Sequence, residues 1–145
     1  MSKAAVLDTL TQVGTVVNAL GNLTVGQGRT RYGDLADSED DVRMLDPEVA
    51  GKFWYWLDQY NGSNQTNPTE ITIRCIYECK VLKDQSSTLQ DFVGKLMDII
   101  TALQKETNFT KSRPEGVVAR RADDDLEDRV MQWELDARFM LGPTC

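Results

Sequence analysis

The stretch ITIRCIYECKVL at residues 71–82 decides the fold, because it alternates apolar and polar side chains as a strand buried on one face does. A second stretch, VMQWELDARFML at residues 130–141, alternates in the same way. A slip of one residue would turn either apolar set towards solvent, so the pairing register is tightly specified. Residues 71–81 and 130–141 are therefore predicted to be strands of one sheet.

Two further stretches have the apolar spacing of amphipathic helices. Residues 88–104, TLQDFVGKLMDIITALQ, lie between the two strands, and residues 2–22 open the chain. Gly21 stands where a C-terminal cap of the first helix is expected. The predicted buried stripes include Val6, Leu7, Leu10, Val13 and Val17 in the first helix and Phe92, Val93, Leu96, Ile99 and Leu103 in the second.

The other segments complete an α+β prediction. The aromatic-rich KFWYWLDQYN at residues 52–61 is a third strand candidate, and GVVARR at residues 116–121 is the predicted hairpin partner of the last strand. Residues 23–50 are predicted to be mostly loop with one short strand. We therefore expect a mainly antiparallel sheet of about four to five strands with two amphipathic helices on one face. The length of 145 residues suits a single domain over residues 1–145.

The charge balance bears on partners. The chain has a formal charge of −7, which argues against a phosphate-neutralising surface and against specific nucleic-acid binding. It shows neither the pattern of a secretory signal nor an apolar run of about 20 residues that would span a membrane. A soluble protein made in the cytoplasm, without a membrane partner, is the expectation.

Catalytic signals are absent from the sequence patterns. There is no histidine for a zinc site or a nucleophile pair, and Cys75 and Cys79 read as small core residues of one strand face. The GQGR stretch at residues 26–29 lacks the spacing of a phosphate loop and reads as a turn. We expect no enzymatic activity, no cofactor and no metal.

An acidic run includes Asp123, Asp124 and Asp125. Its carboxylates offer oxygen ligands for a divalent cation, but the run lacks the glycine and the spaced carboxylates of a calcium loop. A solvated hairpin tip, whose charge keeps neighbouring strand edges apart, is the favoured interpretation.

Large apolar side chains occur on both faces of some predicted strands, so those outside the core must be buried by another part of the structure or stay exposed. Trp54 and Trp56 lie opposite Tyr55 in the alternation, and Ile76 and Leu82 lie on the polar face of the strand that begins near residue 70. A loop of the same chain, an exposed patch, or burial against another subunit would each account for them.

The whole arrangement resembles the tail terminator proteins of long-tailed bacteriophages. The resemblance rests on an N-terminal helix, a loop-rich acidic stretch, a hairpin ending in EITIRCIYECKVL, the helix TLQDFVGKLMDIITALQ and a closing hairpin ending in VMQWELDARFML. It implies a hexameric ring that binds the last ring of the tail tube, stops its polymerisation and faces the neck of the head. The implied partners are copies of the chain, the tail tube protein and a neck or connector protein, and the implied location is the tail-neck junction of the virion.

The resemblance makes particular residues interface candidates. Trp54, Trp56, Ile76 and Leu82 would be buried between subunits, and Asp123, Asp124 and Asp125 would contribute to an acidic docking face. Two other function classes stay open. One is another neck component or a tail tube subunit, although two long helices argue against a tube subunit. The other is a small α+β enzyme or ligand-binding domain, which would need convergent polar groups in a closed concavity.

Overall fold

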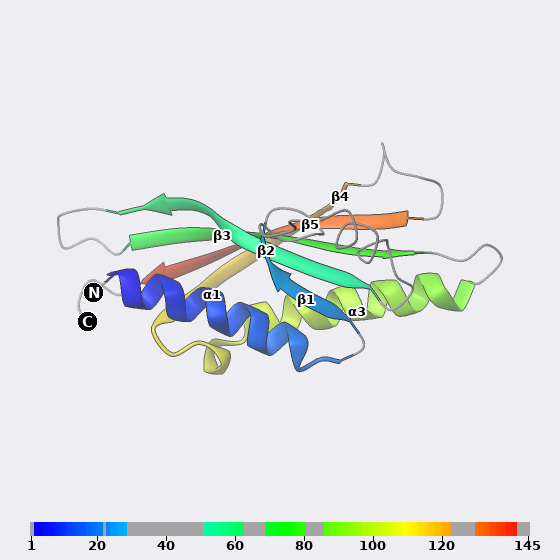
Figure 1. The fold of residues 1–145 in the computed structure, drawn as a ribbon, viewed down its shortest axis with the longest axis horizontal. Coiled ribbons are helices and arrows are strands. Elements are labelled where there is room, and N and C mark those ends of the chain that lie inside the picture. The colour runs from blue at the N-terminus through cyan, green and yellow to red at the C-terminus, as the bar shows by residue number, and fades with distance from the viewer. Residues whose placement is uncertain are drawn as a thin grey trace, which may run out of the picture.

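The computed structural model describes residues 2–21, 23–28, 51–62, 69–80, 86–122 and 130–141 (Figure 1). The elements follow in the order α1 (Ser2–Asn18), β1 (Thr24–Gln27), β2 (Lys52–Asn61), β3 (Thr69–Lys80), α3 (Ser86–Gln104), a 3-10 turn (Glu106–Asn108), β4 (Ser112–Arg121) and β5 (Val130–Leu141). This order confirms the predicted sequence of helix, short strand, two strands, helix and hairpin. The predicted Leu82 and the acidic run at residues 123–125 lie outside the described residues.

The five strands form one sheet in the order β1-β2-β3-β5-β4. All neighbours are antiparallel except β1 and β2, which are parallel. In the central pair, Tyr77 lies opposite Trp133 and Ile71 lies opposite Phe139, so the two apolar alternations share one face. The predicted α+β fold with a mainly antiparallel sheet is thereby confirmed.

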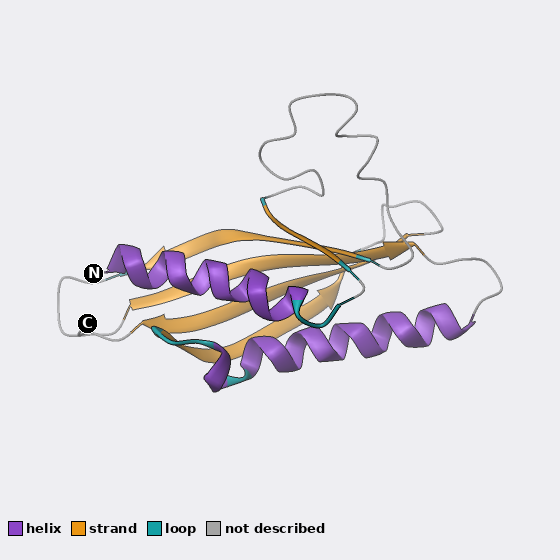
Figure 2. Ribbon diagram, turned by 60° about the horizontal axis from the view of Figure 1, so that its bottom comes forward, coloured by secondary structure: helices purple, strands orange, loops and turns teal. Residues whose placement is uncertain are grey.

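Both helices cover the apolar face of the sheet, each displaced towards a different end of the molecule (Figure 2). The rings of Tyr77 on β3 and Phe92 on α3 stack with their centroids 4.8 Å apart. Towards the other end of the sheet, the ring of Phe109 packs on the ring of Phe139 of β5, with the two centroids 4.7 Å apart. Because the aromatic pairs join β3, β5 and the segment after α3, the core depends on both predicted strands and on the helix between them.

A glycine and a lysine side chain stabilise the C-terminal end of α1. Gly21 has a φ of 74°, a left-handed conformation that glycine adopts without strain. Lys95 of α3 donates from Nζ to the carbonyl oxygens of Gly21 at 3.0 Å and Leu20 at 3.4 Å. A cation at these terminal carbonyls opposes the negative end of the helix, and it also ties α1 to α3.

Gly14 lets α1 approach the sheet closely. Glycine inside a helix is less favourable than alanine by about 1 kcal/mol, which indicates close packing at this position. A Cβ atom at Gly14 would lie 2.4 Å from Oη and 3.2 Å from Cζ of Tyr55 on β2, so any larger residue would force the tyrosine ring or the helix to shift.

We expect Gly14→Ala to destabilise the domain by about 1–2 kcal/mol, because overpacking against Tyr55 outweighs the better helix propensity of alanine. In a Tyr55→Phe background the hydroxyl is gone, and the same substitution should cost less than half as much. Urea unfolding of the four variants of this double-mutant cycle measures the difference. Equal costs in both backgrounds would show that the hydroxyl does not set the helix position.

Candidate assembly surfaces

The face of the sheet opposite the helices holds the aromatic and aliphatic residues singled out from the sequence. Trp54 and Ile76 are register partners on β2 and β3, and they are 7% and 8% exposed. Of the three alternatives for these two residues, burial within the chain is therefore the one observed. Trp56 is half-buried, opposite Arg74.

This face also contains a buried pair of opposite charges that the alternation pattern concealed. Lys52 on β2 lies opposite Glu78 on β3, and the two are 3% and 0% exposed. Gln132 of β5 donates from Nε2 to Oε1 of Glu78 at 3.2 Å. Charged side chains in a strand ordinarily indicate a solvated face, so sequence alone places these two wrongly in solvent.

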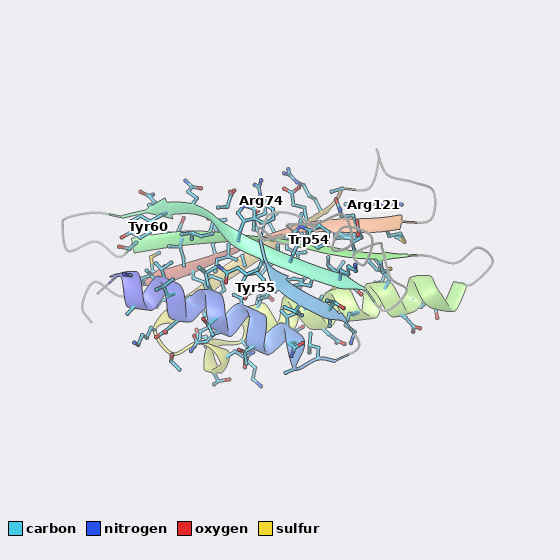
Figure 3. All side chains as sticks on the ribbon, viewed as in Figure 1. Trp54, Tyr55, Tyr60, Arg74 and Arg121 are labelled. Carbon is cyan, nitrogen blue, oxygen red and sulfur yellow. The ribbon has the colours of Figure 1, made fainter. Side chains whose placement is uncertain are left out.

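Arg74 organises the partly exposed centre of the same face (Figure 3). Its Nε donates to Oδ1 of Asp136 at 2.9 Å and lies 3.5 Å from Oε1 of Glu134, and its Nη2 lies 3.7 Å from Oδ2 of Asp58. The hydrogen bond to Asp136 raises the pKa of the Arg74 guanidinium above its ordinary value. One cation thus links three carboxylates from β2 and β5, the two strands that flank β3.

Replacing Arg74 by Met should lower the free energy of unfolding by about 1–2 kcal/mol, since three neighbouring carboxylates lose their shared cation. Arg120 offers a matched control because its side chain pairs with Glu134 at 2.9 Å and is 66% exposed, about twice as exposed as that of Arg74. Arg120→Met should cost less than about 0.5 kcal/mol. Urea unfolding at low salt compares the two variants, and equal costs would contradict the role of Arg74 as the centre of the cluster.

Among the described residues, the exposed large apolar side chains lie along two edges of the sheet. They are Leu7, Leu57, Tyr60, Val93, Met97 and Val118, each between 37% and 60% exposed. The helix periodicity placed Leu7 and Val93 on buried stripes, but they are 52% and 50% exposed, so that assignment is wrong. The reason is their angular position, because Leu7 and Val93 lie about 100° around their helices from the buried Val6 and Phe92 and so at the margins of the two stripes.

Three of these residues form the β2 edge patch: Leu7, Leu57 and Tyr60. Leu57 and Tyr60 lie opposite Ile73 and Ile71, so they share the helix side of the sheet. Leu7 precedes Gly14 by two helical turns and therefore lies on the same side of α1, the side that meets Tyr55. β1 pairs only with Lys52–Tyr55, so among the described strands none covers residues 56–61 of this edge.

Two of the others form the β4 edge patch: Val93 and Met97. On α3, Val93 and Met97 point away from Lys95, which faces α1. Because α3 also packs on β4, this side of the helix overlooks the outer edge of that strand. Val118 lies on β4 itself but on the opposite face of the sheet, because its register partner Asp136 lies opposite Arg74. β4 has no strand partner on its outer side in the described part of the chain.

A shallow groove separates the second halves of α1 and α3. Its volume is about 410 Å³, and it is lined by Thr15, Val16, Ala19, Leu20, Asp98, Thr101, Ala102, Lys105 and Asn108. Asn108 is engaged there as a donor to the carbonyl oxygen of Ala102 at 2.9 Å. The groove is open to solvent.

The two thiols of β3 are core groups, as their place on the apolar alternation predicted. Cys75 and Cys79 are 0% and 1% exposed. Burial raises the pKa of the Cys75 thiol far above its ordinary value and that of Cys79 to about 12. A nucleophilic or metal-binding cysteine must be a thiolate near neutral pH, so neither thiol suits those tasks.

These thiols should make the domain sensitive to alkali. In the unfolded chain they ionise near pH 9, whereas in the folded chain they stay neutral to about pH 12 for Cys79. Stability is therefore complete below pH 9 and falls above it, by roughly 1.4 kcal/mol per thiol for each pH unit. Urea unfolding between pH 8 and 10.5 measures this slope. Cys79→Ala should flatten it, and an unchanged slope would contradict the assignment.

The described residues contain no group of three or more histidine, cysteine, aspartate or glutamate side chains placed to hold a metal ion. No described helix is long and apolar enough to cross a membrane.

No protein-family model matches the chain, and comparison with curated proteins finds no sequence relative. Function is therefore argued from the distribution of buried charge, exposed apolar side chains and open strand edges.

Proposed function

We propose that the protein is a structural component of a long-tailed phage that forms a ring on the end of the tail tube. The observation that carries this proposal is the division of the exposed large apolar side chains between two different edges of one sheet, Leu7, Leu57 and Tyr60 on one side and Val93, Met97 and Val118 on the other. An exposed apolar patch commonly marks a protein interface. Two unlike patches on opposite edges suit head-to-tail contacts, which close into rings when the rotation permits.

The described architecture supports the same proposal through the resemblance to tail terminators. The helix, the hairpin, the second helix and the closing hairpin occur in the order on which that resemblance rests, and the loop-rich acidic stretch lies outside the described residues. By this resemblance the ring is a hexamer that stops tube polymerisation and joins the tail to a neck or connector protein. The charge of −7 on every subunit favours partners with basic docking surfaces and disfavours wrong ones.

The proposal requires no catalytic step. The observed geometry suits a mechanical role. On the sheet face opposite the helices, Arg74 forms ion pairs with residues of both neighbouring strands, and Lys52 and Glu78 are buried. A rigid subunit presents the same edges to each neighbour, and ring closure gives every subunit two neighbours. In a closed ring, a subunit dissociates only when both of its contacts break, so individually weak contacts can stabilise the assembly.

Tail tubes polymerised from the tube protein of the same phage test the proposed function. Purified protein added to growing tubes should be seen only at tube ends by negative-stain electron microscopy, and it should shorten the mean tube length in proportion to its concentration. Met97→Glu should reduce capping, whereas Ala102→Glu, about 140° around α3 from Met97 and in the groove, should leave it intact. Binding along the whole tube would indicate a tube or sheath component instead. No binding to tubes, together with tight binding of a small metabolite, would overturn the structural role.

A further inference from the structure

The two open strand edges differ in which part of their length is suitable for pairing. β4 has an irregular register between Pro114 and Gly116, and a proline cannot donate to a neighbouring strand. Bulges and prolines are features that keep an edge from adding a strand. From Val117 to Arg121 the register of β4 is regular, so this half is the part able to accept a neighbour.

On the opposite edge the suitable part is the second half of β2. β1 and the N–H of Gly28, which donates to the carbonyl oxygen of Tyr55 at 2.8 Å, occupy the first half of that edge. On their outer side, residues 56–61 have no described strand. The available halves are thus offset along the sheet, and Figure 3 shows Tyr60 near one end and Arg121 towards the other.

The register of the paired strands gives the offset between the two available halves in residues. Leu57 of β2 lies level with Ile73 of β3, and Arg121 of β4 lies level with Tyr77 through their shared partner Trp133. Ile73 and Tyr77 are four residues apart. A displacement of four residues, roughly 13 Å along the strands, therefore brings Arg121 of one copy level with Leu57 of the next and gives the two halves their fullest overlap.

From this geometry we infer that copies of the chain join edge to edge, the second half of β4 in one copy adding as an antiparallel strand to the second half of β2 in the next. This inference rests on the proposed function in taking a closed ring as the product. The strand directions fit, because β2 and β5 are each antiparallel to β3, and β4 is antiparallel to β5. A β4 strand therefore meets the β2 strand of a copy in the same orientation in antiparallel fashion.

Three consequences of the displacement favour a second copy as the occupant of this edge. It keeps β4 clear of the neighbour's β1, and it leaves the irregular half of β4 outside the contact. It also brings the β4 edge patch alongside the β2 edge patch, so both apolar surfaces are covered by one contact. A stagger between successive strands is, moreover, what a sheet needs in order to close around an axis.

The charges of the two halves agree with this pairing. The second half of β4 contains Arg120 and Arg121 and no acidic residue, whereas residues 56–61 contain Asp58 and no basic residue. Opposite charges across an interface select the partner and its orientation more than they raise affinity. Two β4 edges brought together would instead place arginines against arginines, which disfavours a symmetric dimer through this strand.

Disulfide trapping tests the pairing and its displacement together. A displacement of four residues places Val118 beside Asn61 of the neighbouring copy, since Val118 is level with Arg74 and Asn61 with Glu70. Without displacement Asn61 would instead meet Arg113, which is level with Glu70. In a Cys145→Ser background, Val118→Cys and Asn61→Cys chains mixed under mild oxidation should give mixed dimers. The double variant should give a ladder of linked chains on a non-reducing gel.

The outcomes separate the possibilities. Cross-links between Val118→Cys and Asn61→Cys support the inference. Links between Arg113→Cys and Asn61→Cys in their place, links between two Val118→Cys chains, or the absence of links would each overturn it. Tube-end capping by the unaltered protein is scored separately. Capping without the predicted cross-link supports the proposed function and rules out the edge pairing. The cross-link without capping supports the edge pairing and rules out the proposed function.

Discussion

Leu96→Asp should abolish the folded domain. Leu96 is 4% exposed on the core side of α3, between Phe92, which stacks on Tyr77, and the fully buried Ile99. A carboxylate at this position has no water, and the apolar neighbours give it no cation, so the cost is about 4 kcal/mol or more. A domain of this size has a total stability of roughly 5–15 kcal/mol. We expect loss of the cooperative thermal transition in circular dichroism, or a fall in its midpoint by more than about 15 °C.

Met97 provides the matched control, because it is the next residue on the same helix and is 52% exposed. Met97→Glu should change the free energy of unfolding by less than about 1 kcal/mol. If Leu96→Asp melted at the temperature of the unaltered protein, α3 would not belong to the core, and the packing of the helix on the sheet would be refuted.

The second large effect concerns assembly. If contacts run head to tail, Leu57→Glu removes one partner surface and Met97→Glu removes the other, and neither variant alone should form rings. A charge buried in an apolar contact costs about 2 kcal/mol or more, roughly a thirtyfold loss of affinity at every junction. An equimolar mixture retains one intact junction, formed by the β4 edge of the Leu57→Glu chain and the β2 edge of the Met97→Glu chain. The mixture should therefore give dimers and no rings.

Native mass spectrometry, at a concentration where the unaltered protein forms rings, measures the composition of each sample. Ala102→Glu is the control on α3, since Ala102 lines the groove and lies about 140° around the helix from Met97. Rings in the mixture would mean that the two patches are not partners. Loss of dimers as well as rings would mean that both substitutions act on the same surface, as in a symmetric contact.

The strands and helices of this chain follow from local patterns. Period-two alternation identified the strands at residues 71–81 and 130–141, and the structure pairs them directly, Tyr77 with Trp133 and Cys75 with Leu135. Strand alternation succeeds because successive side chains must point to opposite faces whatever lies beyond the sheet. The same holds for Gly21 and Gly14, since the end of a helix and a close approach to a tyrosine each require the absence of a side chain.

The candidate surfaces were not determined by the sequence in this way. Trp54 and Ile76 looked like interface residues but are buried within the chain, and Lys52 and Glu78 looked solvated but are buried as well. Conversely, Leu7 and Val93 occupy positions of a buried helical stripe and yet are half-exposed. A periodic pattern states which side chains share a face, but burial depends on what is placed over that face. Only the tertiary arrangement, which places the sheet against one side of each helix, decides which apolar side chains are left exposed at the two edges.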